Sequence, residues 1–205
     1  MPAKRRSTAS QETRTAIVTA AHQLFVERGY HATSMRRIAA RAQVALGGIY
    51  NHFDSKEAIY VAVLEAYNPY SLVLPSLRAA SGATAEAYLR DVADKMVGLL
   101  RERPVTLHLM FIEMVEFDAR HIPHLAQTIL PQLAEVLARL REFGPQLRPV
   151  PLPAMVRAFF GLMVSYMFTE IVFRAVGGSE DMDWLGHTLD IFLNGVIARP
   201  KEARS

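Results

Sequence analysis

Apolar residues recur every three to four positions along nearly the whole chain, and no segment alternates apolar and polar residues for long. The first spacing is that of an amphipathic helix, whereas sustained alternation would indicate a strand. The sequence therefore predicts an all-α protein of about nine helices. It contains no cysteine, which excludes disulfide bonds and thiolate metal sites as supports of the fold and favours a reducing, cytoplasmic location.

The most apolar run comprises twelve uncharged residues, 158–169. A helix needs about 20 such residues to cross a bilayer, so this run is expected to be a buried helix and no membrane partner is expected. The first residues, MPAKRRSTASQETR, are basic and polar, and they do not fit a secretory signal peptide.

Positive charge is concentrated at one end of the chain. Residues 1–60 carry nine Lys/Arg against four Asp/Glu, whereas residues 61–205 carry fourteen against sixteen. A basic head on a nearly neutral body indicates that the head meets a polyanion such as DNA. A basic N-terminus that serves only solubility would leave the same pattern.

Helix start and stop signals divide the chain further. The segment 68–82 contains Pro69, Pro75 and Gly82, and it is expected to separate head from body. Pro131 is expected to kink or interrupt its helix. Helices are expected over about 11–28, 34–42, 45–53, 55–68, 84–103, 104–117, 122–143, 153–176 and 182–198.

Two short helices joined by a turn, after a longer helix, predict a helix-turn-helix unit whose second helix can enter the major groove of DNA. Gly47 and Gly48 lie inside that second helix, where each costs about 1 kcal/mol relative to alanine. Close approach to another surface would offset this cost. Ile49 and Phe53 form the inner face of the helix, so the glycines face outward, and we interpret the approaching surface as DNA.

Residues 33–59, TSMRRIAARAQVALGGIYNHFDSKEAI, resemble the DNA-binding domain of the tetracycline-repressor (TetR/AcrR) family of bacterial transcriptional regulators. The resemblance covers residues 11–66, and its core is the pattern V-x-x-G-x-I-Y-x-H-F-x-S-K-E. It implies a helix-turn-helix DNA-binding domain over residues 1–54, followed by a helical ligand-binding and dimerisation domain over 55–205.

The resemblance implies contacts with the DNA backbone at five positions. Thr33 and Ser34 would bind a phosphate through their hydroxyl and backbone N–H groups. Tyr50 and His52 would hold the DNA backbone, and Lys56 would neutralise a further phosphate.

The same resemblance implies which residues reach the bases. Arg36 would contact a phosphate or a guanine edge. Leu46, Gly47, Gly48 and Asn51 would face the base edges, although only Asn51 among these four has a hydrogen-bonding side chain.

The sequence departs from the family pattern at several of these positions. Ala45 stands where a Ser or Thr usually caps the second short helix, and Gln43 stands where the turn usually has glycine. Leu46 replaces a frequent basic residue and Gly48 a frequent Thr or Ala. Asp54 and Glu57 have the spacing of a capping box at the start of the next helix.

A helix over 153–176 is apolar nearly all round, so it needs its own chain on one side and a partner on the other. The resemblance implies that it pairs, together with the helix over 182–198, with its symmetry mates in a four-helix bundle. A homodimer predicts a palindromic operator with half-sites about 34–36 Å apart or further. The expected interface residues are Phe160, Val164, Phe168, Val172, Leu185, Leu189, Phe192 and Val196.

The resemblance also implies a small-molecule cavity in the body, and methionine and aromatic residues suit an adaptable apolar pocket. Core packing alone would explain the same residues. Glu113 and Glu116 are candidates to orient a ligand. The pocket residues expected are Met96, His108, Phe111, Met114, Phe159, Met163, Tyr166 and Met167.

The leading functional prediction is a repressor that a small, largely apolar effector releases from DNA; activation, constitutive DNA binding and ligand carriage remain alternatives. An enzyme is not expected, since the sequence has no HExxH, Walker or GxGxxG motif. No cofactor is expected.

Asp118, His121 and His124 have a spacing that suggests a metal site, but the loop around Pro123 gives such a site poor geometry.

Overall fold

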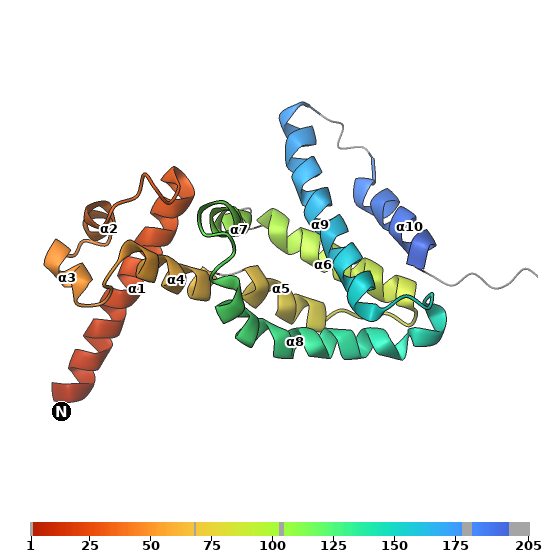
Figure 1. Ribbon diagram of the computed structural model, residues 1–205, viewed down its shortest axis with the longest axis horizontal. Coiled ribbons are helices and arrows are strands. Elements are labelled where there is room, and N and C mark those ends of the chain that lie inside the picture. The colour runs from red at the N-terminus through yellow and green to blue at the C-terminus, as the bar shows by residue number, and fades with distance from the viewer. Residues whose placement is uncertain (1, 68, 103–104, 178–181, 197–205) are drawn as a thin grey trace, which may run out of the picture. The chain divides into compact units, whose positions relative to one another are not determined.

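The computed structural model describes residues 2–67, 69–102, 105–177 and 182–196. Side chains are described for these residues apart from 2–7, 69–72, 105–106 and 196. Helices make up most of the described chain and no strand occurs in it (Figure 1), which confirms the prediction of an all-α protein.

Ten α-helices and one 3-10 turn occupy the described residues. One helix more is present than the sequence suggests, because α5 forms in the segment expected to separate head from body. The bounds are α1 (Pro2–Arg28), α2 (Met35–Arg41), α3 (Leu46–Tyr50), α4 (Lys56–Tyr67), α5 (Pro69–Arg78), α6 (Ala85–Glu102), α7 (Val105–Glu116), α8 (Ile122–Glu142), η1 (Gly144–Gln146), α9 (Leu152–Ala175) and α10 (Trp184–Val196).

Proline does not end helices here in the way that the sequence indicates. Pro69 begins α5, where its missing N–H has no helical partner to lose, and Pro75 lies inside the same helix. Pro131 lies within α8, which continues past it, so of the two expected effects the interruption is wrong and the kink stays a prediction. A single proline removes one backbone hydrogen bond, and the remaining bonds of a 21-residue helix carry it through.

The chain packs into two compact units. One comprises the residues up to Leu72 together with Glu102–Ile129, and the other comprises Val73–Arg101 together with the residues from Leu130 onward. By packing, α4 and α7 therefore belong to the same unit as the helix-turn-helix. The predicted boundary between residues 54 and 55 concerns function, and it stays a prediction.

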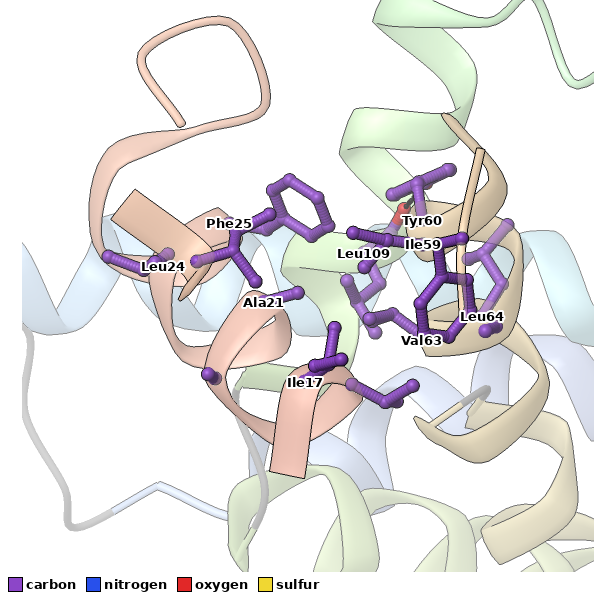
Figure 2. Close-up of a cluster of buried hydrophobic side chains, with 14 of the residues drawn as sticks. Ile17, Ala21, Leu24, Phe25, Ile59, Tyr60, Val63, Leu64 and Leu109 are labelled. Carbon is purple, nitrogen blue, oxygen red and sulfur yellow. Dashed lines mark hydrogen bonds between the residues drawn. The ribbon is translucent and has the colours of Figure 1, made fainter. Parts of the chain in front are cut away.

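In the first unit, α1, α4 and α7 contribute to one buried cluster (Figure 2). The α1 members are spaced by three or four residues, so they form a single stripe along the helix. Ile59, Tyr60, Val63 and Leu64 of α4 face this stripe, and the Tyr60 hydroxyl donates a hydrogen bond to the carbonyl of Leu109 at 3.1 Å. The buried residues of α1 are Ile17, Val18, Ala20, Ala21, Leu24 and Phe25.

In the second unit, α6 is strongly amphipathic, whereas α9 is not. Four residues of α9 are buried, and several of its largest apolar side chains are exposed. Among the described residues, α9 is the one helix long and apolar enough to span a membrane, and 22% of its most apolar window is buried. The apolar run 158–169 was expected to form a buried helix, and α9 is buried on one side only. The exposed large apolar side chains of α9 are Phe160, Phe168, Ile171, Val172 and Phe173.

Candidate nucleic-acid interface

The start of α2 is fixed by two neighbouring hydroxyl groups with different roles. The exposed Ser34 is the N-cap, and its oxygen accepts a hydrogen bond from the N–H of Arg37 at 3.3 Å. Thr33 is 1% exposed, and its hydroxyl lies 2.9 Å from the Gly29 carbonyl and 3.2 Å from the Leu24 carbonyl. Its N–H donates to the carbonyl of Tyr30 at 3.2 Å. Thr33 therefore closes the α1–α2 connection, and the phosphate contact predicted for it is wrong.

Lys56, the first residue of α4, is also used inside the chain. Its ammonium donates to the carbonyls of Tyr30 at 2.8 Å and Thr33 at 2.9 Å, and it lies 4.0 Å from the centre of the Tyr30 ring. Burial lowers the pKa of Lys56 from its ordinary value. An ammonium group has three N–H donors, so one is left for the phosphate that the sequence predicts. Lys56 ties α4 to the α1–α2 connection.

The turn between α2 and α3 has an unusual backbone at Gln43. Its φ of +58° lies in the left-handed region, which costs a residue with a side chain about 1–2 kcal/mol. The conformation is held by a hydrogen bond from the N–H of Val44 to the carbonyl of Ala39 at 3.0 Å. A glycine, which is usual at this place in the family pattern, would adopt it without strain.

The inner face of α3 is locked into the core. Ile49 is fully buried and Phe53 is 5% exposed, and Val44 packs against the same cluster. Ala45 is the N-cap and makes no side-chain cap hydrogen bond, as the sequence predicts. Packing rather than capping therefore holds this short helix in place.

The outer face of α3 is open. Leu46 is 38% and Tyr50 is 51% exposed, and Gly47 and Asn51 are exposed as well. A Cβ atom built on Gly47 or Gly48 would meet no other heavy atom of the chain within 4 Å, outside the helix's own neighbouring backbone. The fold therefore does not require glycine at either position. Packing within the described chain does not offset the cost of these glycines.

The three arginines of α2 differ in their contacts. Arg36 is exposed, and Arg37 is exposed while donating to the carbonyl of Ala32 at 2.8 Å. Arg41 makes a two-pronged contact with Glu27 at 3.0 and 2.9 Å, and this hydrogen-bonded pair lowers the pKa of Glu27. Arg41 is thus paired with α1, although its side chain remains exposed.

Arg14 is a candidate DNA-contacting residue that the sequence pattern did not single out. Its guanidinium lies 5.0 Å from the centre of the Phe53 ring, beside the connection between α3 and α4. The contact joins residues far apart in the chain, so no spacing rule within one helix could have found it. The basic composition of the first 60 residues was the only available signal.

Contacts of α4 and α7 correct two further predictions. The cap of α4 is Ser55, whose oxygen accepts from the N–H of Ala58 at 3.0 Å, so the capping box expected of Asp54 and Glu57 is wrong. Glu57 instead lies 3.3 Å from both His121 and Arg120. The fully buried carboxylate of Glu113 accepts from the His121 N–H at 2.8 Å and contacts the His121 ring at 3.0 Å.

Glu113 is therefore committed within its own unit and is not placed to orient a ligand. Glu116 likewise pairs with His31 at 2.5 Å. Two of the residues considered for a metal are paired with carboxylates. The His121 ring contacts Glu113 and Glu57, and His124 contacts Glu65 at 2.8 Å. Among the described side chains, no group of three or more His, Cys, Asp or Glu is arranged to hold a metal ion.

The residues predicted to line one effector pocket are divided. Met96 and Phe159 line a small apolar cavity of about 80 Å³, and Tyr166 lines a larger cleft in the same unit. Met163 and Met167 are buried. The other three belong to α7 in the first unit, where they are exposed: His108, Phe111 and Met114.

The predicted interface residues divide by exposure. Phe160, Phe168 and Val172 are 40%, 46% and 57% exposed, and Val164, Leu185 and Phe192 are partly buried. Leu189 is 2% exposed and packs inside its own unit, so its assignment to an intersubunit surface is corrected. The side chain of Val196 lies outside the described residues.

Comparison with known proteins places the helix-turn-helix in a family. Residues 17–63 match the model of the bacterial regulatory proteins, tetR family. The segment that contains the helix-turn-helix is therefore similar to the DNA-binding domain of the TetR family. The matched residues include α2 and α3 together with the parts of α1 and α4 that carry their core.

Curated relatives match the TetR-family domain and little beyond it. The chain is 47% identical over 58 residues to the transcriptional repressor Rv3405c of Mycobacterium tuberculosis, covering 28% of this chain and 31% of that protein. It is 46% identical over 56 residues to the transcriptional activator FasR of Mycolicibacterium smegmatis, covering 27% and 26%. The chain thus matches less than a third of the length of these relatives.

The fold extends the likeness to nearly the whole chain. A putative tetR family transcription regulator from Shewanella sp. PV-4 superposes with a TM-score of 0.68 at 20% identity, covering 91% of this chain and 99% of that one. At this identity the likeness concerns the fold alone. The TetR-family domain is therefore followed by helices in a familiar arrangement whose side chains have diverged.

Proposed function

We propose that this protein is a homodimeric, sequence-specific DNA-binding transcriptional regulator. The observation that carries the proposal is the outer face of α3, where Gly47 and Gly48 have open space around them while Ile49 is locked in the core. Two surface glycines destabilise the helix by about 2 kcal/mol in the free protein. Close approach of a base-pair edge or sugar-phosphate backbone is what such a face would accommodate.

Charge and exposure support the same surface. Arg36 on α2 is exposed and able to reach a phosphate or a guanine edge. Tyr50 and Asn51 are exposed at the end of α3, and Ser34 is exposed at the start of α2. Lys56 and Thr33 serve this surface indirectly, since they fix the connection from which α2 begins.

The exposed apolar side of α9 supports dimerisation. Phe168 and Val172 are about half exposed, and they are one helical turn apart on the same side of the helix. Burial of such side chains against a second copy of this chain would remove a large apolar patch from water. A two-fold dimer then requires an operator with two inverted half-sites, about 34–36 Å apart or a larger multiple of the helical repeat.

We further propose that the regulator is a repressor released by a small, largely apolar molecule bound in the body. Rv3405c is named a repressor and FasR an activator, so the sign of regulation needs its own test. Release requires that the effector bind better to the state whose two heads do not fit adjacent major grooves. The methionine and aromatic residues around the cavity of about 80 Å³ form soft walls able to enlarge around a ligand.

The test is selection of genomic fragments by the purified full-length protein, with Gly47→Leu selected in parallel. The wild-type protein is expected to enrich a few sites that share an inverted repeat, and the variant is expected to enrich none of them. Equal recovery of random fragments by both proteins would contradict the proposal. The genes beside the enriched sites then supply candidate effectors.

A constitutive DNA binder is the nearest alternative. A compound that raises the melting temperature of the free protein and also releases it from the selected site supports the effector-responsive repressor. Compounds that stabilise the protein while leaving the DNA complex unchanged favour the alternative. A ligand carrier that merely retains the domain would show no salt-dependent affinity for any duplex.

A further inference from the structure

The first residue of α3, Leu46, is an apolar residue that the fold leaves partly in water. It is 38% exposed, whereas Ile49 of the same helix is fully buried. The next two residues, Gly47 and Gly48, have no side chain, and the space that a Cβ atom would enter is open at both. Leu46 is therefore the one exposed apolar side chain beside a stretch of bare helix backbone.

Polar side chains occur only toward the end of α3 and just beyond it. The side chains of residues 46–49, which are Leu, Gly, Gly and Ile, contain no polar atom. The hydroxyl of Tyr50 and the amide of Asn51 follow, and both residues are exposed. The side chains in the first part of α3 can therefore recognise a base edge only by apolar contact.

The major groove of DNA presents one apolar group at the base edges, the C5 methyl group of thymine. The other edges present hydrogen-bond donors and acceptors. A leucine placed against a donor or acceptor removes it from water without offering a partner, which costs free energy. An apolar side chain at a base edge thus favours thymine and disfavours the other three bases.

The two glycines bear on the reach of this leucine. A leucine side chain is short compared with the arginines and lysines that often read base edges, so its contact with a base requires close approach of the helix backbone. Glycine is suited to such an approach because it has no Cβ atom. The open space at Gly47 and Gly48 and the exposure of Leu46 therefore serve the same contact.

We propose that Leu46 determines part of the operator sequence by contacting the C5 methyl group of one thymine in each half-site. Gly47 and Gly48 permit the close approach that this contact requires. The proposal rests on the DNA binding proposed above, and it adds a preference that DNA binding alone does not imply. Each half-site then contains an A·T pair at the position facing Leu46, with the thymine on a defined strand.

Replacement of thymine by deoxyuridine tests the proposal, because deoxyuridine keeps the base pair and lacks only the methyl group. The full-length protein is titrated with the operator selected from the genome and with duplexes in which one thymine position at a time is replaced in both half-sites. At one position the replacement is expected to weaken wild-type binding about tenfold, because one methyl contact is lost in each half-site. Wild-type binding that tolerates deoxyuridine at every position would overturn the proposal.

Leu46→Ala identifies the residue that makes the contact. This variant is expected to bind the thymine and deoxyuridine operators equally, since it lacks the side chain that reaches the methyl group. Leu130→Ala, at an exposed leucine of α8, is the matched control and is expected to keep the tenfold difference. Should Leu46→Ala unfold, Leu46→Gln keeps the length of the side chain without its apolar end, and it is expected to lose the difference in the same way. A tenfold difference that persists in a folded Leu46 variant would refute the role of Leu46.

Failure of this proposal is distinguishable from failure of DNA binding. A protein that selects an operator but does not respond to the methyl groups overturns the role of Leu46 and leaves DNA binding in place. A protein that selects no operator overturns both.

Discussion

The outer face of α3 and the outer face of α9 are both exposed, but they are built on opposite principles. On α3 the exposed positions are glycines and polar-tipped residues, and the opposite side is anchored by Ile49 and Phe53. On α9 the exposed positions are large apolar side chains, including Phe168 and Val172. The first face suits close approach of a rigid, charged helix such as DNA, and the second suits a deformable apolar partner.

The difference also explains which region can be recognised in the sequence. Base-pair geometry permits few arrangements of a reading helix, so the residues around α3 follow a pattern that matches a family model over residues 17–63. Apolar contacts between helices tolerate many combinations of side chains of similar volume. The body therefore keeps the fold of its structural neighbours at about 20% identity.

The largest expected effect comes from filling the space in front of α3. Gly47→Leu is expected to weaken operator binding by about 100-fold or more, about 2.8 kcal/mol, because its side chain occupies the volume that DNA would enter. The free energy of unfolding is expected to stay the same or rise by up to about 1 kcal/mol, since glycine is a poor helix former. Titration of the selected operator and thermal unfolding measure the two quantities.

Gly98→Leu is the matched control, because Gly98 also lies in a helix with open space around it, on α6. Its operator affinity is expected to equal that of the wild-type protein. If Gly47→Leu binds as tightly as Gly98→Leu, the α3 face is not the DNA-binding surface.

The second test charges the apolar face of α9. Val172→Asp is expected to raise the dimer dissociation constant by about 100-fold, because an isolated buried carboxylate costs several kcal/mol. Sedimentation velocity across a concentration series measures the shift. Val115→Asp, at a valine on α7 that is 75% exposed, is expected to leave the dimer intact. Equal dissociation constants for the two variants would remove α9 from the interface.

Substitution of Lys56 distinguishes a residue that supports the fold of the DNA-binding unit from a residue that contacts DNA. Lys56→Met leaves the carbonyls of Tyr30 and Thr33 without their donor, and it is expected to lower the free energy of unfolding by about 1–3 kcal/mol. Operator affinity is expected to fall, while the slope of log K against log salt stays at the wild-type value. Arg36→Ala is the contrasting variant, with a slope reduced by about 0.9. A reduction of that size in Lys56→Met would show that the third N–H of Lys56 binds a phosphate.

The smallest expected effect concerns the turn before α3. Gln43→Gly is expected to raise the free energy of unfolding by about 0.5–1 kcal/mol, because the left-handed backbone at this position strains any residue with a Cβ atom. Chemical denaturation measures the change. Gln11→Gly, at an exposed position inside α1, is the control and is expected to lower stability by about 1 kcal/mol. A loss of stability in both variants would show that the backbone at Gln43 is not strained.

The helices and the inner faces of the first unit could be predicted from the sequence, because burial imposes a period that is visible in one dimension. Ile49 and Phe53 are expected on an inner face, and both are buried. Helix continuation was harder to predict. Pro131 lies within a long helix, because the surrounding hydrogen bonds outweigh the effect of one proline, and α5 begins at Pro69, where the missing N–H costs no helical hydrogen bond.

The direction of a polar side chain could not be predicted in the same way. The motif places Thr33 and Lys56 beside the DNA-binding helices, but both turn inward to backbone carbonyls that the sequence does not identify. Leu189 has the helical spacing of an interface residue, but it is buried in its own unit. The prediction was wrong because an apolar stripe does not reveal which neighbour covers it. The larger cleft that Tyr166 lines joins three helices, so no local pattern in the sequence indicated it.

The claim that α3 presents its glycine face to DNA is tested most directly by competition between the selected operator and a duplex of the same composition with one half-site scrambled. At physiological salt, the account predicts that two chains bind each operator, with an affinity about 1,000-fold higher than for random duplex. The account also predicts that scrambling one half-site removes most of this preference. Equal affinity for the operator, the scrambled duplex and random DNA would contradict it.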